Sequence, residues 1–284
     1  MKEIVERIEA HIQQDPGSRG LCNWARQGDM FPAINSLRKG SHMVITTGFF
    51  ILRAGAIETD GPPGSIILAR ALSKMGKQVS ILVDEHSEKI MEKGLALFKC
   101  AIKLVTVPVG RPIVPDSVFT EETTHLIALE RPGRAVDGKY YNFMGQDISA
   151  HVAPVDDLFD YARENGVTTI GIGDGGNELG MGKVSRAVDK YVAPDRAFSC
   201  RTYADYCICA GVSNWAGYGM AAILSIMAKQ ASMPDPARLE KLIKTNVAAG
   251  AVDGISGKPE ATVDGLEYSW EHSVFCEVCK FAAR

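Results

Sequence analysis

Short runs of apolar and β-branched residues recur along this chain, and each is followed by an acidic loop and a helical pattern. The runs occupy residues 43–50, 78–83, 102–107, 123–129, 168–172 and 203–210. Parallel strands need long crossovers that are usually helical, so this alternation is typical of βαβ units. The sequence therefore predicts an α/β fold with three layers, α/β/α, around a mostly parallel, Rossmann-like central sheet. Its 284 residues suit a single domain over 1–284.

Composition excludes several classes of partner. The net charge is −3, which argues against binding to nucleic acid or to an anionic membrane surface. No apolar run reaches the ~18 residues of a membrane span. Seven cysteines on mostly apolar segments indicate reduced thiols, and we expect a cytoplasmic protein that acts on a small molecule. The sequence leaves open whether the chain forms a homo-oligomer.

Acidic residues follow most of the predicted strands. Crossovers place the carboxyl ends of parallel strands at one edge of the sheet, which is where ligands bind in open α/β folds. Crowded carboxylates raise one another's pKa, and a hard divalent cation with oxygen ligands would relieve them. We therefore expect a site for Mg²⁺, Mn²⁺ or Ca²⁺ among Glu58, Asp60, Asp84, Asp174 and Glu178, with Glu85 and Glu130 at the same edge. Alternatively, Asp60 only caps the helix that begins near Pro62.

The stretch Thr168 to Val184, TTIGIGDGGNELGMGKV, is the most informative of these strand ends. Glycines allow backbone N–H groups to approach a ligand, so Gly175, Gly176 and Asn177 are predicted to contact the substrate. Two other interpretations remain open. The glycines match a weak G-x-G-x-x-G dinucleotide pattern, although an acidic residue in the turn would repel a pyrophosphate. The turn could also be purely structural.

A long loop follows the strand at 123–129 and extends to about residue 154. Loops of that length inside a compact domain are usually functional or disordered, and the aromatic residues argue against disorder. Arg131, Arg134 and Lys139 lie in it. Such cations suit a substrate that carries a carboxylate, so we expect this loop to form a wall over the acidic edge.

Several phrases of the chain resemble the D-glutamate cyclase family. They are ETDGPPG at 58–64, DGKYYN at 137–142, GDGGNELGMGKV at 173–184, AGVSNWAGYG at 210–219 and VDGISG at 252–257. The resemblance implies a cyclase domain that stands alone, without the additional N-terminal domain of the vertebrate mitochondrial members. It also implies a hydro-lyase that converts D-glutamate to 5-oxo-D-proline with loss of water.

This chemistry fits an acidic pocket. Ring closure needs a neutral amine, and a carboxylate base would remove its proton. A divalent cation would polarise the attacked carboxyl group and stabilise the oxyanion. We therefore expect catalytic roles for Asp174, Glu178 and Asp60. The competing hypotheses are a metal-dependent phosphohydrolase, a non-catalytic protein that binds a cation or metabolite, and an NAD(P)-dependent oxidoreductase.

Overall fold

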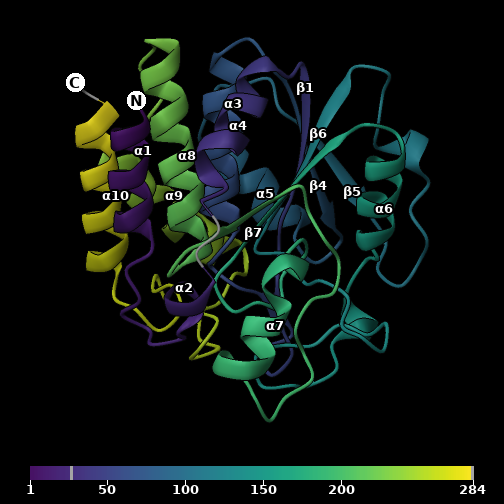
Figure 1. The fold of residues 1–284 in the computed structure, drawn as a ribbon. Helices are drawn as coiled ribbons and strands as arrows, with labels where there is room; N and C mark the ends of the chain where they lie inside the picture. Colours follow the sequence, from purple (N-terminus) through teal and green to yellow (C-terminus); the bar gives the residue numbers. More distant parts are fainter. Residues whose placement is uncertain (26–27, 283–284) are drawn as a thin grey trace.

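A sheet of six parallel strands runs through the computed structural model, which describes residues 1–25 and 28–282 (Figure 1). The strands lie in the order β5-β4-β1-β6-β7-β8. Their bounds are β1 His42–Thr46, β4 Gln78–Asp84, β5 Lys103–Val107, β6 Thr123–Leu129, β7 Thr168–Gly173 and β8 Tyr206–Cys209. A separate antiparallel hairpin joins β2 Phe50–Ile51 to β3 Ala56–Ile57. The predicted three-layer α/β fold is confirmed, and this main sheet is wholly parallel.

The strand order is that of a Rossmann-type doubly wound sheet. The chain moves outward from β1 through β4 to β5, and then returns to the other side of β1 with β6. The crossover after β1 therefore leads toward one edge of the sheet, to β4, and the crossover after its neighbour β6 leads toward the other edge, to β7. The crevice at their carboxyl ends is the place where such folds bind ligands.

Helices cover both faces of the sheet. Their bounds are α1 Lys2–Ile12, α2 Leu21–Trp24, α3 Met30–Lys39, α4 Pro62–Lys74, α5 Glu88–Leu95, α6 Asp156–Glu164, α7 Ser185–Ala187, α8 Ser213–Ala228, α9 Pro236–Ala249 and α10 Tyr268–Ala282. Short helical turns lie at η1 Pro115–Ser117, η2 Ser149–His151, η3 Gly182–Val184 and η4 Val188–Val192. No helix within residues 1–25 and 28–282 is long and apolar enough to cross a membrane.

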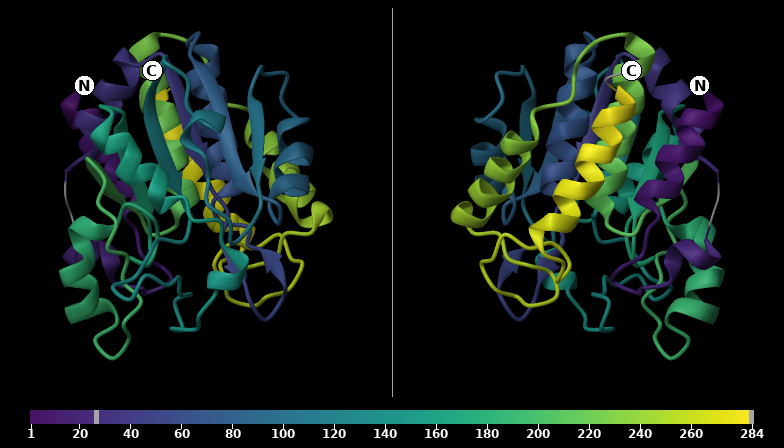
Figure 2. Two further views of the ribbon diagram at one scale, coloured as in Figure 1. Left: turned by 90° about the vertical axis from the view of Figure 1, so that its right-hand side faces the viewer. Right: turned by 90° about the vertical axis from the view of Figure 1, so that its left-hand side faces the viewer.

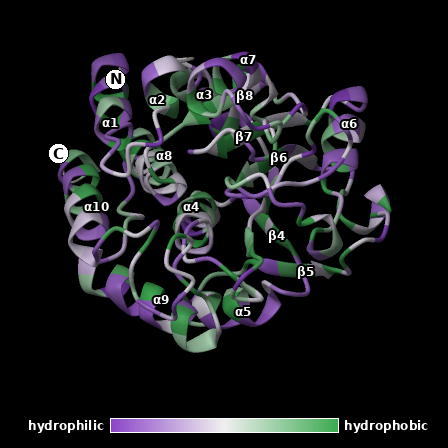
Figure 3. Cartoon of the chain, turned by 90° about the horizontal axis from the view of Figure 1, so that it is seen from below, coloured by the Kyte–Doolittle hydropathy of each residue, from purple (hydrophilic) through white to green (hydrophobic). Residues whose placement is uncertain are grey.

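The two faces are covered unequally (Figure 2). Strand residues alternate between the faces, so Met43 and Ile45 join the larger core while Val44 joins the smaller one. The larger core contains α3, α4, α5 and α8 against the sheet, with α1, α9 and α10 packed outside them. The smaller core is covered by α6. Seen toward the carboxyl ends of the strands, α4 and α8 lie near the middle of the molecule (Figure 3).

Helices α4 and α8 approach each other closely where both begin. A Cβ atom added to Gly217 would lie 2.7 Å from the carbonyl oxygen of Gly64, so no larger residue fits without a backbone shift. This contact brings the N-termini of both helices to the carboxyl edge of the sheet. The acidic groups described below gather at that point.

Candidate functional site

Three buried carboxylates from three different strand ends meet at this edge. Asp60 follows the β2–β3 hairpin, Glu130 follows β6 and Asp174 follows β7. Each offers an oxygen, and these oxygens lie within 4.8 Å of one another. The three side chains are almost inaccessible to solvent. The parallel topology thus concentrates negative charge in a region that water hardly enters.

Asp60 and Asn214 cap the two converging helices reciprocally. The Asp60 carboxylate accepts hydrogen bonds from the backbone N–H groups of Ser213 and Asn214 at the start of α8, at 2.9 and 2.7 Å. The Asn214 side-chain oxygen in turn accepts from the N–H groups of Gly61 and Gly64 at the start of α4, at 3.0 and 2.8 Å. Asp60 therefore caps α8, and it also accepts from the N–H group of Gly61, at 2.9 Å, where the helix that follows it in sequence begins.

Glu178 organises the glycine-rich turn. Its carboxylate accepts hydrogen bonds from the N–H groups of Gly175 and Gly176, both at 2.7 Å, and from that of Asp174 at 3.3 Å. The glycine N–H groups that were expected to face the substrate are thus engaged within the turn. Asn177 donates to the backbone carbonyl of Tyr141 at 2.9 Å and so fixes the tip of the long loop.

Arg19 and Asp264 complete the cluster, and sequence reasoning missed both. Arg19 lies between α1 and α3, and its side chain is 16% exposed. Its guanidinium contacts Asp174 and lies 2.7 Å from Asp264. Neither residue belongs to a strand–helix unit. Asp264 could have been noticed because it lies shortly after the VDGISG phrase, but no sequence pattern pointed to Arg19.

Two of these acidic residues have a positive backbone φ angle. Glu130 has φ +48° and Asp264 has φ +54°. Residues other than glycine seldom adopt this left-handed region, and each such residue costs of order 1–3 kcal/mol. Backbone strain of this kind gathers at functional sites, which agrees with the crowding of charge here.

Burial and like charge shift the protonation of the cluster. Burial raises the pKa of Glu58, Asp60 and Glu130, and the neighbouring carboxylates raise it further. Burial also raises the pKa of Asp264 to about 8, although the positive charge of Arg19 opposes the shift. For Arg19, burial alone would lower the pKa, but Asp174 and Asp264 raise it above its usual range. The arginine is therefore charged, and part of the acidic cluster holds protons near neutral pH.

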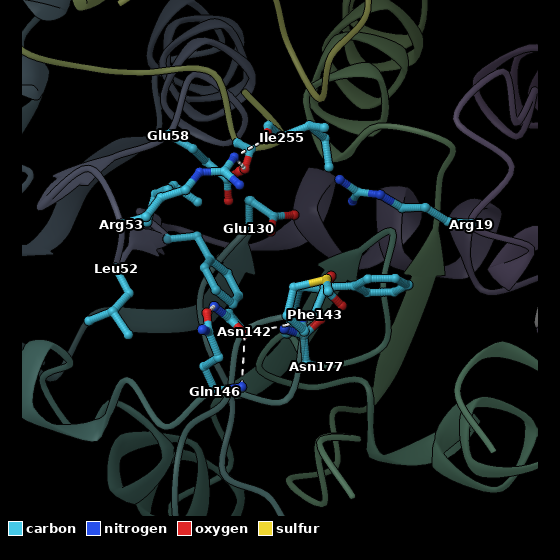
Figure 4. A pocket seen from close by; sticks show the side chains of 15 residues that line it. Arg19, Leu52, Arg53, Glu58, Glu130, Asn142, Phe143, Gln146, Asn177 and Ile255 are labelled. Carbon is cyan, nitrogen blue, oxygen red and sulfur yellow. Dashed lines mark hydrogen bonds between the residues drawn. The ribbon is translucent and has the colours of Figure 1, made fainter. Parts of the chain in front are cut away.

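A pocket of about 210 Å³ opens beside the cluster (Figure 4). Glu58, Glu130 and Arg19 line its inner part. Its walls are the β2–β3 hairpin with residues 49 and 51–53, the tip of the long loop with residues 142–144 and 146, and residues 254–255 after α9. At about 30 Å³ for each water molecule in the liquid, this space holds roughly seven waters, which suits a small amino acid.

The cations expected from the long loop lie elsewhere. Arg131 is fully buried, with its guanidinium 2.6 Å from the carboxylate of Asp84, so each neutralises the other away from the pocket. Arg134 pairs with acidic residues of α6, and Lys139 pairs with Asp147 on an exposed part of the loop. The loop does form a wall of the pocket, but it contributes amide and apolar side chains there.

The cluster has the donors that a hard cation requires. Asp174 Oδ2 and Glu130 Oε2 are buried and have no hydrogen-bond partner among the described residues. Buried carboxylate oxygens without partners are costly, and oxygen ligands are those that Mg²⁺, Mn²⁺ and Ca²⁺ prefer. Asp60, Glu130 and Asp174 therefore could hold a metal ion, whose identity the donor set does not select.

Comparison with known proteins gives a consistent result. A family model described as "D-glutamate cyclase-like, C-terminal" matches residues 8–277. The chain is also similar to a protein of Homo sapiens named "D-glutamate cyclase, mitochondrial", with 33% identity over 308 residues. The alignment covers 95% of this chain and 50% of the human protein, so the chain spans about half the length of this curated relative.

Proposed function

This chain belongs to the D-glutamate cyclase-like family, and we propose that it cyclises D-glutamate to 5-oxo-D-proline with loss of water, as a hydro-lyase that uses a divalent cation. The observation that carries the proposal is the buried set of carboxylates beside a pocket of amino-acid size. A substrate ammonium group is attracted to this acidic cluster, because among the described residues Arg19 is the only cation within salt-bridge distance of Asp60, Glu130, Asp174 or Asp264.

The first requirement of the reaction is a neutral amine. The substrate nitrogen carries three protons near neutral pH and cannot attack until it loses one. Glu58 lines the pocket, and burial raises the pKa of its carboxyl group. A carboxylate whose pKa is raised holds a proton more strongly than a free glutamate does, so it accepts one from an amine more readily. We assign this role to Glu58.

The proton balance is consistent with one carboxyl group that acts twice. As the nitrogen bonds to the γ-carboxyl carbon, a C–O bond breaks and the nitrogen loses two protons in total. Both protons leave with the departing oxygen as water. Glu58 can take each proton from nitrogen and deliver it to oxygen, so the cycle ends with the enzyme in its starting state.

The attacked group is a carboxylate, which is a poor electrophile. Asp60, Glu130 and Asp174 would hold the cation, and a cation bound there would act as a Lewis acid toward this group. The N-termini of α4 and α8 point to the same place and favour negative charge there. Glu178 accepts hydrogen bonds from the N–H groups of Asp174 and Gly175, and these bonds hold Asp174 in place.

The test is product formation from each enantiomer of glutamate. We expect 5-oxoproline from D-glutamate and not from L-glutamate, with activity lost in EDTA and restored by Mg²⁺ or Mn²⁺. Asp174→Asn should abolish both turnover and the rise in melting temperature caused by the cation. Lys139→Ala, which removes an exposed lysine outside the pocket, is the matched control.

The outcomes separate the proposal from its rivals. No 5-oxoproline from D-glutamate with either cation would overturn the cyclase assignment, and hydrolysis of phosphoesters under the same conditions would favour a phosphohydrolase. Full activity in EDTA would overturn the cation requirement alone. Wild-type activity in Asp174→Asn would show that the reaction does not depend on Asp174.

A further inference from the structure

Two arginines line the pocket, and their electrostatic surroundings differ. Arg19 has a carboxylate on each side, Asp174 and Asp264. Arg53 has no carboxylate within salt-bridge distance in the described part of the chain. The two guanidiniums enter from opposite sides of the pocket, with Glu130 between them (Figure 4). Arg53 therefore brings an uncompensated positive charge to the pocket, whereas the charge of Arg19 is already matched.

The backbone of a distant loop holds Arg53 in place. The side chain extends from the β2–β3 hairpin, and Nη2 donates to the carbonyl oxygens of Gly254, at 3.2 Å, and Ile255. Carbonyl acceptors orient a guanidinium without neutralising it, and its other N–H groups stay available. A Cβ atom added to Gly257 would lie 2.6 Å from Arg53 Nε, so residue 257 has to be small for this arrangement.

We propose that Arg53 binds the α-carboxylate of the substrate, the carboxylate that does not react, and that it makes the pocket selective for amino acids with two carboxyl groups. The inference rests on the proposed function and assigns a residue that the reaction itself does not require. Under the proposed function the γ-carboxyl group lies at the inner end of the pocket, which Glu130 lines beside the buried Asp60 and Asp174. The α-carboxylate then needs a separate partner, and an oriented guanidinium binds a carboxylate well.

This assignment also gives a basis for the choice of enantiomer. The amine is directed to Glu58, the γ-carboxyl group to the buried cluster and the α-carboxylate to Arg53. Three attachments at one tetrahedral carbon define its handedness, since the L-enantiomer can satisfy only two of them at a time. If Arg53 is removed, the pocket should bind D-glutamate weakly and distinguish the two enantiomers less well.

The experiment compares D-glutamate with D-isoglutamine, which has a neutral amide in place of the α-carboxylate and can still form the ring. For Arg53→Ala we expect KM for D-glutamate to rise about 10–100-fold, as for the loss of a charge-assisted hydrogen bond, while kcat changes little. The wild-type preference for D-glutamate over D-isoglutamine should disappear. Arg53→Lys should recover part of it, and the dissociation constant for D-glutamate measured by calorimetry should follow KM.

Arg238→Ala is the matched control. Arg238 is also exposed and donates to a backbone carbonyl, that of Leu97, but it lies outside the pocket. Its removal should leave KM and the preference unchanged. Thermal melting of each variant establishes that it is folded.

Failure of this inference is distinguishable from failure of the proposed function. A wild-type KM and preference in Arg53→Ala would overturn the role of Arg53 while the cyclase assignment stands. If the wild-type protein binds D-glutamate without cyclising it, only the proposed function fails, and the calorimetric comparison still decides on Arg53. A wild-type protein that neither binds nor cyclises D-glutamate would overturn both.

Discussion

Glu271 provides a sharp test of how burial of charge limits the stability of this fold. It lies on α10 and is almost inaccessible to solvent. Its carboxylate accepts hydrogen bonds from the Trp215 indole and, at 2.8 Å, from the Tyr218 hydroxyl, both on α8. Burial raises its pKa from 4.5 to about 7, although these two hydrogen bonds oppose the shift. The residue therefore joins two helices of the larger core at an electrostatic cost.

The sign of the pH dependence follows from the raised pKa. Below pH 4.5 the carboxyl group is protonated in both the folded and the unfolded chain, and it carries no penalty. Between 4.5 and about 7 the unfolded chain loses the proton first, so the free energy of unfolding falls as pH rises. Above about 7 the full penalty is present. At 1.36 kcal/mol for each pKa unit, its ceiling is about 3 kcal/mol.

Glu271→Gln removes the charge and keeps most of the contacts. The amide oxygen can still accept from the Trp215 indole, but the Tyr218 hydroxyl loses an acceptor, at a cost of about 1 kcal/mol. We therefore expect the variant to be more stable than the wild type by about 1–2 kcal/mol at pH 8, and equal or slightly less stable at pH 5.

The assay is urea unfolding at pH 5, 6, 7 and 8, followed by tryptophan fluorescence and circular dichroism. Glu277→Gln on the same helix is the control. Glu277 is exposed, and its pKa is lowered by a hydrogen bond from Lys280, so it is ionised throughout this range and should not change the pH profile. If the profile of Glu271→Gln ran parallel to that of the wild type from pH 5 to 8, the reasoning would be refuted.

Two further substitutions test the architecture around the site. Asn214→Ala leaves the buried N–H group of Gly64 without its acceptor, whereas the N–H group of Gly61 keeps Asp60 Oδ1, so we expect a loss of about 1–3 kcal/mol in the free energy of unfolding by urea titration. A loss below about 0.5 kcal/mol would contradict the reciprocal caps. Gly171→Ala places a Cβ atom 2.7 Å from the Gly180 backbone, and overpacking against backbone should cost about 3 kcal/mol in the same assay. A variant with wild-type stability would show that the turn moves easily.

The sequence predicted the sheet and the acidic edge because both depend on local patterns. Apolar, β-branched runs identify the strands, and the crossover rule then places their carboxyl ends together without knowledge of any contact. This reasoning brought Asp60, Glu130 and Asp174 to one place, and the structure confirms that they meet there. The strand expected over residues 43–50 ends at Thr46 instead, because Phe50 pairs in the β2–β3 hairpin.

The partners of the charged residues could not be predicted in the same way. The long loop carries Arg131 and Arg134, and the local pattern gave no reason to separate them from the acidic edge. In the structure, Arg131 forms a salt bridge with Asp84. Arg134 forms salt bridges with Asp157 and Asp160 of α6. Such pairs join residues that lie about 20 to 50 positions apart, and only the packing of the loop decides which pair forms.

The cations that do reach the pocket come from segments outside the strand–helix pattern. Arg19 lies between the first helices, and Arg53 lies in a turn of the small hairpin. Single arginines in irregular segments usually face solvent, so composition and periodicity do not mark them. Their places become visible only through their partners, which are carboxylates for Arg19 and backbone carbonyls for Arg53.

The two arginines have different electrostatic roles: Arg19 compensates buried carboxylates, and Arg53 is left to bind a carboxylate of the substrate. A cluster with several buried carboxylates cannot all be ionised unless cations compensate them, and Arg19 supplies only one positive charge. The remaining charge can be met by protons, by a metal ion or by the ammonium group of a substrate. Each of these is a participant in the proposed reaction. A fold that matched every carboxylate with its own arginine would leave nothing for the substrate or the cation to neutralise.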